Sequence, residues 1–168
     1  MKNFEVINVL ELLVRYLEEG RIKVDPGVHK MVTTYHDPCN YTRKSLKAFG
    51  KSYAEEGRWV TKQCAPNFKE MYPSHEGNYC CGAGGGAWAM SFHEERVFYG
   101  RVKAKQIERT GAQLVVTPCH NCRDQIMKSL TKEYNLEVEV KYLWELVADS
   151  LVLPSQKSAG QEHKEQAL

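Results

Sequence analysis

Residues 112–122 read AQLVVTPCHNC, a compact apolar run between Gly111 and Pro118 that leads into two cysteines. A short, continuous apolar run of this kind is typical of a strand buried on both faces of a parallel sheet. The residues that follow, about 119–133, have a helical pattern. This stretch therefore predicts a strand that passes directly into a helix, which is the repeating unit of a parallel α/β fold.

The rest of the chain continues the alternation of strands and helices. Strands are predicted at 30–36, 112–118 and 137–142, and helices at 4–18, 40–56, 91–109, 119–133 and 143–151. Gly57 is expected to close the second helix, and residues 58–79 to be irregular or to hold one short strand. The sequence thus predicts an α/β, Rossmann-like fold with a mainly parallel sheet and flanking helices.

Composition limits the number of domains and the kinds of partner. The chain has 168 residues, 42% of them apolar and 26% charged, which suits one domain with its own core, expected over residues 1–153. Residues 154–168, PSQKSAGQEHKEQAL, have little apolar content and are expected to be disordered. A net charge of +2 without a run of five basic residues predicts no nucleic-acid partner.

The first twenty residues mix acidic with apolar side chains, so they predict neither a signal peptide nor a membrane span. A cytoplasmic chain of this size needs no disulfide bonds, and clustered cysteines there are more often metal ligands or redox centres. Cys39 and Cys119 both follow a predicted strand and precede a predicted helix. At such points ligands bind parallel sheets, and the helix N-terminus favours a thiolate.

Residues 79–86 read YCCGAGGG, with two adjacent cysteines followed by four glycines in five residues. Adjacent cysteines rarely pair, because the disulfide between them is strained, and dense glycine indicates a backbone that bends tightly or approaches something closely. With Cys39 and the pair Cys119 and Cys122, these cysteines have the spacing C-x40-CC-x37-C-x2-C. Five sulfurs could therefore converge at the carboxyl edge of the sheet.

Three kinds of site compete for this pattern. A zinc ion needs four ligands, usually from two C-x2-C pairs, but the chain has one such pair. A thiol–disulfide exchanger would use Cys119 and Cys122, and would leave Cys39, Cys80 and Cys81 unexplained. A centre with several irons fits better, because neighbouring thiolates can bind different irons of one cluster.

Three further residues are weaker candidates for catalysis. His36 and His120 lie next to the cysteine motifs, where each could donate a proton to a departing thiolate. Alternatively, they could hydrogen-bond to cluster sulfurs or to the backbone at the helix ends. Cys64 lies outside the five-cysteine pattern. It could be a core thiol, an extra ligand or a thiol on the substrate side.

The motifs HDPC (36–39), YCCGAGGG (79–86) and TPCHNC (117–122) together resemble one copy of the cysteine-rich CCG domain. That domain occurs in heterodisulfide reductases and in iron–sulfur subunits of lactate, glycolate and glycerol-3-phosphate oxidation systems. The stretches GAGGGAWAM, FHEERV, PCHNCRDQIMKSL and KYLWELVADSL are most similar to the C-terminal part of heterodisulfide-reductase-like K subunits from the membrane complexes of dissimilatory sulfite reduction. The resemblance covers roughly residues 4–153.

The resemblance implies an iron–sulfur cluster of the [4Fe-4S] type, which is non-cubane in heterodisulfide reductase. The implied ligands are the five motif cysteines: Cys39, Cys80, Cys81, Cys119 and Cys122. The implied lining of the open side of the cluster is the glycine backbone, at Gly82, Gly84 and Gly85. The implied chemistry is two-electron reduction of a disulfide or related polysulfide, or its reverse. A small sulfur-carrier protein with a trisulfide is the implied substrate of the sulfite-reducing branch.

The resemblance also implies partners and a location. Proteins of this kind work with other iron–sulfur subunits and membrane cytochrome subunits of a respiratory complex, at the cytoplasmic face of the membrane. They carry ferredoxin clusters and another CCG-type region upstream, which this sequence lacks. The chain is therefore expected to be a fragment of a longer subunit or a small subunit that receives electrons from a partner. A non-catalytic electron-relay module is the competing interpretation.

Overall fold

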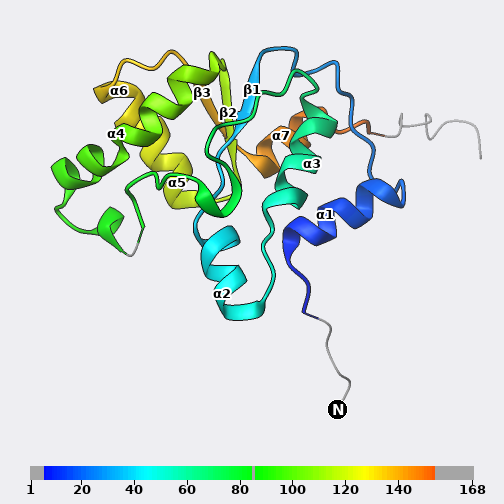
Figure 1. Ribbon diagram of the computed structural model, residues 1–168. Helices are drawn as coiled ribbons and strands as arrows, with labels where there is room; N and C mark the ends of the chain where they lie inside the picture. The colour runs from blue at the N-terminus through cyan, green and yellow to red at the C-terminus, as the bar shows by residue number, and fades with distance from the viewer. Residues whose placement is uncertain (1–5, 85, 154–168) are drawn as a thin grey trace, which may run out of the picture.

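A three-stranded parallel sheet forms the centre of the protein in this computed structural model, which describes residues 6–84 and 86–153 (Figure 1). The strands are β1 (Thr33–Tyr35), β2 (Leu114–Thr117) and β3 (Glu139–Tyr142), and β2 lies in the middle. In register, Val115 of β2 pairs with Thr34 on one side and Val140 on the other. All four residues of β2 are buried, which confirms the strand predicted from its continuous apolar run.

Seven α-helices surround this sheet in the described part of the chain: α1 (Val9–Glu18), α2 (Ser45–Phe49), α3 (Ala54–Cys64), α4 (His93–Thr110), α5 (His120–Gln125), α6 (Thr131–Glu133) and α7 (Leu143–Ser150). A π-helical turn, η1 (Asn40–Lys44), leads into α2, and a second, η4 (Ile126–Leu130), joins α5 to α6. Two short 3₁₀ turns, η2 (His75–Gly77) and η3 (Ala87–Ala89), lie in the loops around the glycine-rich segment. The predicted α/β fold with a parallel sheet is confirmed.

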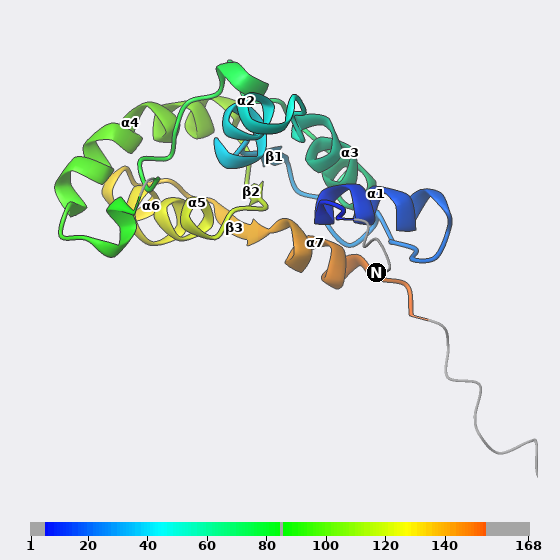
Figure 2. The ribbon, with the colours of Figure 1, turned by 90° about the horizontal axis from the view of Figure 1, so that it is seen from below.

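The helices cover both faces of the sheet, as the view in Figure 2 shows, with α4, α5 and α6 on one side of the strands and α1, α3 and α7 on the other. Side chains of β2 alternate between the two cores. Val115 packs with residues of α4, α5 and η4, whereas Leu114 and Val116 pack with residues of α1, α3 and α7. The alternation follows from the two-residue period of a strand. We call these two cores the α4 face and the α3 face.

Two predicted helix boundaries are wrong, since the first helix begins at Val9 and not at residue 4, and the second ends early. The helix expected over 40–56 ends at Phe49, where Gly50 adopts a left-handed conformation, and α3 then runs straight through Gly57. Residues 58–64 are therefore helical rather than irregular. Gly57 serves close packing instead of helix termination, because a Cβ at this position would lie 2.0 Å from the hydroxyl of Tyr35 in β1.

The other expectations for these segments have mixed outcomes. The short strand suggested within residues 58–79 is limited to a single parallel bridge between Phe68 and Thr33. The disordered tail predicted for 154–168 lies outside the described residues. Among residues 6–84 and 86–153, no helix combines the length and the apolar character needed to cross a bilayer.

A buried ion pair connects α3 to the segment that follows β1. Two guanidinium nitrogens of Arg58 donate to the carboxylate of Asp37, one of them at 2.6 Å, and a third donates to Glu70 at 2.6 Å. Asp37 also accepts the backbone N–H of His75 at 2.8 Å. Because Asp37 stands two residues before Cys39, this network fixes the position at which the first cysteine leaves the sheet.

Candidate metal centre at the carboxyl edge of the sheet

Three separate segments bring five cysteines to the same edge of the sheet. Cys39 follows β1 and immediately precedes η1, while Cys119 follows β2 and caps α5, which carries Cys122 in its first turn. Cys80 and Cys81 belong to the loop that precedes α4. Together they surround a cavity of about 30 Å³, lined by His36, Cys39, Asn40, Cys80, Cys81, Gly84, Cys119, Asn121 and Cys122. The predicted convergence is therefore what the fold produces.

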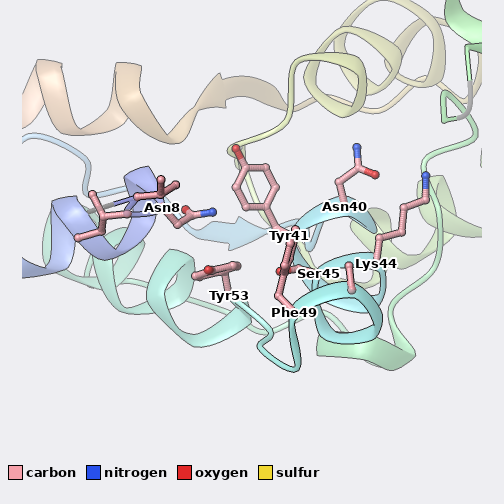
Figure 3. A pocket seen from close by; sticks show the side chains of 10 residues that line it. Asn8, Asn40, Tyr41, Lys44, Ser45, Phe49 and Tyr53 are labelled. Atoms are coloured by element: carbon pink, nitrogen blue, oxygen red, sulfur yellow. The ribbon is translucent and has the colours of Figure 1, made fainter. Parts of the chain in front are cut away.

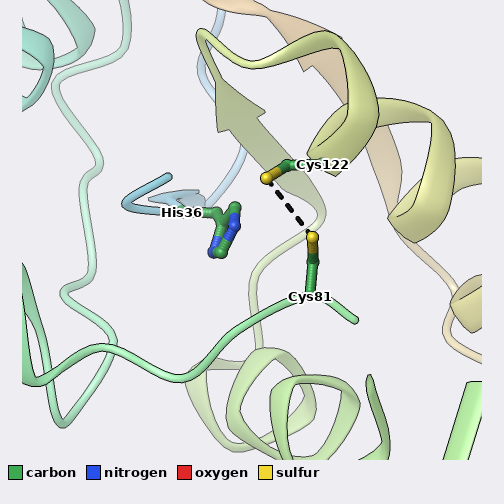
Figure 4. A group of neighbouring side chains, drawn as sticks. All are labelled: His36, Cys81 and Cys122. Atoms are coloured by element: carbon green, nitrogen blue, oxygen red, sulfur yellow. Dashed lines mark hydrogen bonds between the residues drawn. The ribbon is translucent and has the colours of Figure 1, made fainter. Parts of the chain in front are cut away.

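The five sulfurs form a continuous row. Cys39 interacts with Cys80, Cys80 with Cys81, Cys81 with Cys122, and Cys122 with Cys119. The Sγ atoms of Cys81 and Cys122 lie 3.3 Å apart, and Figure 4 shows them facing each other from the loop and from α5. All six cysteines of the chain are free thiols.

Proton sharing along this row gives the sulfurs different pKa values. Contacts with the thiols of Cys39 and Cys81 hold the pKa of Cys80 well below its usual value, and the first of these contacts raises the pKa of Cys39. Cys122 lowers the pKa of Cys119 to about 6, and its own pKa is raised well above the usual value by the sulfurs of Cys119 and Cys81.

In the middle of the row, the pKa of Cys81 is raised to about 12. The contact with Cys122 lowers this pKa, but the contact with Cys80 and burial together raise it by more. Sulfurs this close cannot all be negatively charged, and the pKa is accordingly lowered at Cys80 and Cys119 and raised at the other three. A metal centre would remove that limit, because its positive charge allows every ligating sulfur to lose its proton.

A helix N-terminus was expected to lower the pKa of both cysteines at the strand ends, Cys39 and Cys119. The pKa is lowered at Cys119 and raised at Cys39. Backbone N–H groups of Asn121 and Cys122 add to the lowering of the pKa of Cys119. At Cys39, the contact with Cys80 and partial burial outweigh any such help, and the pKa is raised. A neighbouring thiolate is closer and carries a full charge, whereas the helix end carries about half a charge.

The glycines beside Cys80 and Cys81 have different roles. Gly82 has a φ of 94°, and a Cβ there would lie 2.3 Å from the carbonyl oxygen of Arg96 in α4, so only glycine allows this turn. Its N–H donates to Cys80 Sγ at 3.3 Å. A Cβ at Gly84 would meet no atom within 4 Å, and Gly84 lines the cavity, so it leaves open space beside the sulfurs. The third predicted glycine, Gly85, lies outside the described residues.

His36 reaches the cysteines, as the sequence suggested. A ring nitrogen of His36 and the sulfurs of Cys81 and Cys122 lie within 4.8 Å of one another, and the imidazole is 1% exposed (Figure 4). Burial, followed by the positive charge of Lys103, holds the pKa of His36 well below its usual value, so the ring is neutral at pH 7. Its Nε2 has no hydrogen-bond partner among the described residues.

The other two candidates lie elsewhere. His120 is exposed, its ring stacks on Tyr142, and its Nδ1 is hydrogen-bonded to the Tyr142 hydroxyl, so it does not line the cavity. Cys64 is fully buried in the core of the α3 face, where burial raises its pKa to about 11. The fold therefore gives Cys64 the surroundings of a core thiol.

Sequence reasoning missed two polar residues behind the cysteines. Lys103 of α4 is fully buried, and its Nζ donates to Asn78 Oδ1 and Gln106 Oε1. The amide of Asn78 also contacts His36. A signal for Lys103 was present, since Gly100, Lys103, Ala104 and Ile107 are spaced to share one face of the helix, and a lysine on an apolar face needs a partner.

Two open hollows flank the cysteine cavity. One, of about 450 Å³, is lined by Tyr79, Cys80, Gly82, Gly84, Tyr99 and Val102 and shares Cys80 and Gly84 with the cavity. The other, of about 740 Å³, is formed largely by η1 and α2 with residues before α1, and Figure 3 shows Tyr41, Phe49 and Tyr53 within it. Asn40 lines both this groove and the cavity. Cys80 is thus accessible from the glycine side, whereas the groove at η1 adjoins the cavity at Asn40 and is lined by none of the cysteines.

The residues present fit a centre with several metal ions better than one with a single ion. A row of five sulfurs offers more donors than the four that a tetrahedral zinc ion takes. Neighbouring sulfurs in the row can each bind a different iron, which suits a cluster with several irons. A single ion could still use the compact group of His36, Cys81 and Cys122.

Comparison with known proteins agrees with the cysteine pattern. Residues 33–127 match the family model of the cysteine-rich domain CCG. The chain is 32% identical over 155 residues to the Hdr-like menaquinol oxidoreductase iron-sulfur subunit 2 of Archaeoglobus fulgidus, which covers 88% of this chain and 26% of that protein. It is 30% identical over 151 residues to a subunit of the dihydromethanophenazine:CoB–CoM heterodisulfide reductase of Methanosarcina barkeri, covering 89% of this chain and 35% of that subunit.

A third relative has a different name. It is a subunit of the fumarate reductase (CoM/CoB) of Methanothermobacter marburgensis, with 30% identity over 142 residues, which covers 84% of this chain and 26% of that subunit. This chain thus spans between about a quarter and about a third of the length of these relatives. No solved structure matches the chain significantly.

Proposed function

Since this chain belongs to the cysteine-rich CCG family, we propose that it binds an iron–sulfur cluster in a subunit of a heterodisulfide-reductase-like oxidoreductase. The proposed ligands are the five sulfurs at the carboxyl edge of the sheet: Cys39, Cys80, Cys81, Cys119 and Cys122. The observation that carries the proposal is the continuous row of these sulfurs around one cavity. Relatives named as iron–sulfur and heterodisulfide reductase subunits support it.

The proposed reaction is the reduction of a sulfur–sulfur bond, or its reverse. Cleaving a disulfide into two thiols takes two electrons and two protons. A bound cluster would supply one-electron redox steps and an iron site for a substrate sulfur. The chain supplies the cysteine ligands, a rigid glycine turn at Gly82 and an open approach at Gly84, where the hollow beside Cys80 can admit a substrate.

We propose further that electrons come from partner subunits. The chain corresponds to only part of each relative, and the described residues contain one cysteine cluster. Other iron–sulfur subunits and a membrane cytochrome subunit would supply the electrons, and the domain would lie at the cytoplasmic face of a membrane. In the finer form of the proposal, the pathway is anaerobic sulfite or sulfur respiration, and the substrate is a sulfur-carrier protein with a trisulfide.

Anaerobic reconstitution of the full chain with iron and sulfide tests the cluster. The proposal expects about four irons per chain, which is the content of one four-iron cluster. A spectrum that changes when a thiol or disulfide is added would support a substrate-binding centre. A cluster whose spectrum does not change with either a thiol or a disulfide would favour the electron-relay module.

Two other outcomes would replace the proposal. One tightly bound zinc ion per chain, lost in His36→Ala, would indicate a single-metal site at His36, Cys81 and Cys122. Disulfide exchange that persists without iron in Cys80→Ser would indicate a thiol–disulfide exchanger that needs only Cys119 and Cys122.

A further inference from the structure

A chain of polar contacts runs from the interior of α4 to the edge of the cysteine cavity. It starts at Lys103, whose side chain is fully buried, and its Nζ donates to Asn78 Oδ1. The side-chain nitrogen of Asn78, Nδ2, donates to the backbone carbonyl of Asp37 at 2.5 Å and lies 3.4 Å from Nδ1 of His36. His36 lines the cavity. The three side chains come from sequence positions up to 67 residues apart, so only the fold brings them together.

These contacts fix the orientation of the Asn78 amide. Nζ of Lys103 is the donor in its contact with Asn78, so it faces the amide oxygen and not the NH₂ group. The carbonyl of Asp37 only accepts, so it must face the NH₂ group. Both neighbours therefore require the same orientation, which places an N–H donor of Asn78 against Nδ1 of His36.

The orientation of Asn78 in turn determines the tautomer of His36. A neutral imidazole has one donor nitrogen and one acceptor nitrogen, and an amide N–H at Nδ1 makes that nitrogen the acceptor. The ring proton then lies on Nε2, which is buried and has no hydrogen-bond partner among the described residues. A buried N–H without a partner is costly, so a group that accepts from it is expected in the adjacent cavity.

We propose that Lys103 is a positioning residue that acts through Asn78 to hold His36 in the tautomer protonated on Nε2, so that His36 serves the cysteine cavity as a neutral hydrogen-bond donor. The acceptor is a sulfur in that cavity, and its identity as a cluster or substrate sulfur rests on the proposed function. Hydrogen bonds of this kind to the ligand shell tune the potential and affinity of metal centres.

The test uses the iron-free, reduced full chain labelled with ¹⁵N-histidine. Long-range ¹H–¹⁵N correlation spectra report which ring nitrogen carries the proton, and the signals of His36 are assigned by their loss in His36→Gln. The wild type should show the proton on Nε2. Lys103→Met should increase the share of the other tautomer, because only the carbonyl of Asp37 then holds the amide of Asn78.

Two variants keep the test sharp. Lys105→Met changes an exposed lysine on the same helix and should leave the His36 spectrum as in the wild type. Asn78→Asp replaces the N–H donor by a carboxylate, so it should move the proton to Nδ1 even if Lys103→Met does not fold. A wild-type proton on Nδ1, the wild-type spectrum in a folded Lys103→Met chain, or the wild-type spectrum in Asn78→Asp would each overturn the proposal.

A second readout connects the network to the cluster. In reconstituted protein, Lys103→Met should shift the midpoint potential of the cluster, whereas Lys105→Met should not. The two proposals can fail separately, since the tautomer is measured without iron. A chain that takes up no iron would remove the proposed function and leave the tautomer result in place, and an unaltered His36 spectrum would do the reverse.

Discussion

Buried cysteines lie on both faces of the central sheet, in different company. Cys64 on the α3 face is 0% exposed and Cys122 on the α4 face is 4% exposed, so burial hardly distinguishes them. Cys64 packs in a core of leucine and valine side chains, and burial alone raises its pKa, to about 11. Cys122 lies 3.3 Å from the sulfur of Cys81, and neighbouring sulfurs are the main cause of its raised pKa.

The two faces also differ in their buried polar groups. The α4 face contains Lys103, Asn78 and His36 beside the sulfurs, whereas on the α3 side Arg58 of α3 forms ion pairs with Asp37 and Glu70. The first network lies against the cavity, and the second holds the segment that carries Cys39. The difference shows that the neighbours of a buried cysteine, and not its burial, indicate its chemistry.

The strongest test of this comparison exchanges one cysteine on each face. Cys122→Ser should abolish uptake of iron on reconstitution, because it interrupts the row of sulfurs, whereas Cys64→Ala should take up as much iron as the wild type. Iron content and the visible spectrum of the loaded protein are the measurements. Equal loss of iron in both variants would mean that the two faces do not differ in their capacity to bind metal.

A second test separates folding from metal binding. Leu146 is fully buried on the α3 face, and Leu146→Ala should lower the free energy of unfolding by about 2–5 kcal/mol through lost burial and a residual cavity. Urea unfolding of the iron-free chain measures this. The exposed Val152 provides a control, since Val152→Ala should change the stability by less than about 0.5 kcal/mol.

Iron uptake per folded chain should be the same in Leu146→Ala as in the wild type, since α7 contributes no residue to the cavity. A Leu146→Ala chain that folds but binds no iron would show that the α3 face governs the metal site as well.

The smallest expected effect is a pH dependence of stability due to Lys103. Burial lowers its pKa to about 7 in the folded chain, against about 10.4 for an unfolded lysine. Between these values the unfolded chain binds one more proton, so this residue makes the free energy of unfolding rise with pH, by at most about 1.4 kcal/mol per pH unit. Below pH 7 both states are protonated, and the contribution is constant.

The difference in unfolding free energy between the wild type and Lys103→Met isolates this contribution, because the cysteines titrate in both proteins. This difference should increase from pH 7 to pH 9 in favour of the wild type, in iron-free chains under reducing conditions. The difference between the wild type and Lys105→Met should be flat. A flat difference for Lys103→Met as well would mean that the buried ammonium keeps its ordinary pKa.

Much of the fold was predictable because its signals are local. The strand at Leu114–Thr117 and the helix after it follow from an apolar run and a change of period within twenty residues. Gly111 ends α4 with a φ of 63°, as expected for a glycine just past a helix. Gly57 was misread, because a glycine that ends a helix and a glycine that lets a helix touch Tyr35 look alike in sequence.

The sequence by itself determined which cysteines belong together and where two of them leave the sheet. Strand ends, helix starts and cysteine spacing are properties of short stretches, so they can be read without the fold. Only the tertiary structure decided that His36 lines the cavity while His120 stacks on Tyr142, and that Cys64 lies in the opposite core. It also placed Lys103 and Asn78 behind His36. These are contacts between distant segments, and their geometry depends on how the helices pack against the sheet, which no local pattern encodes.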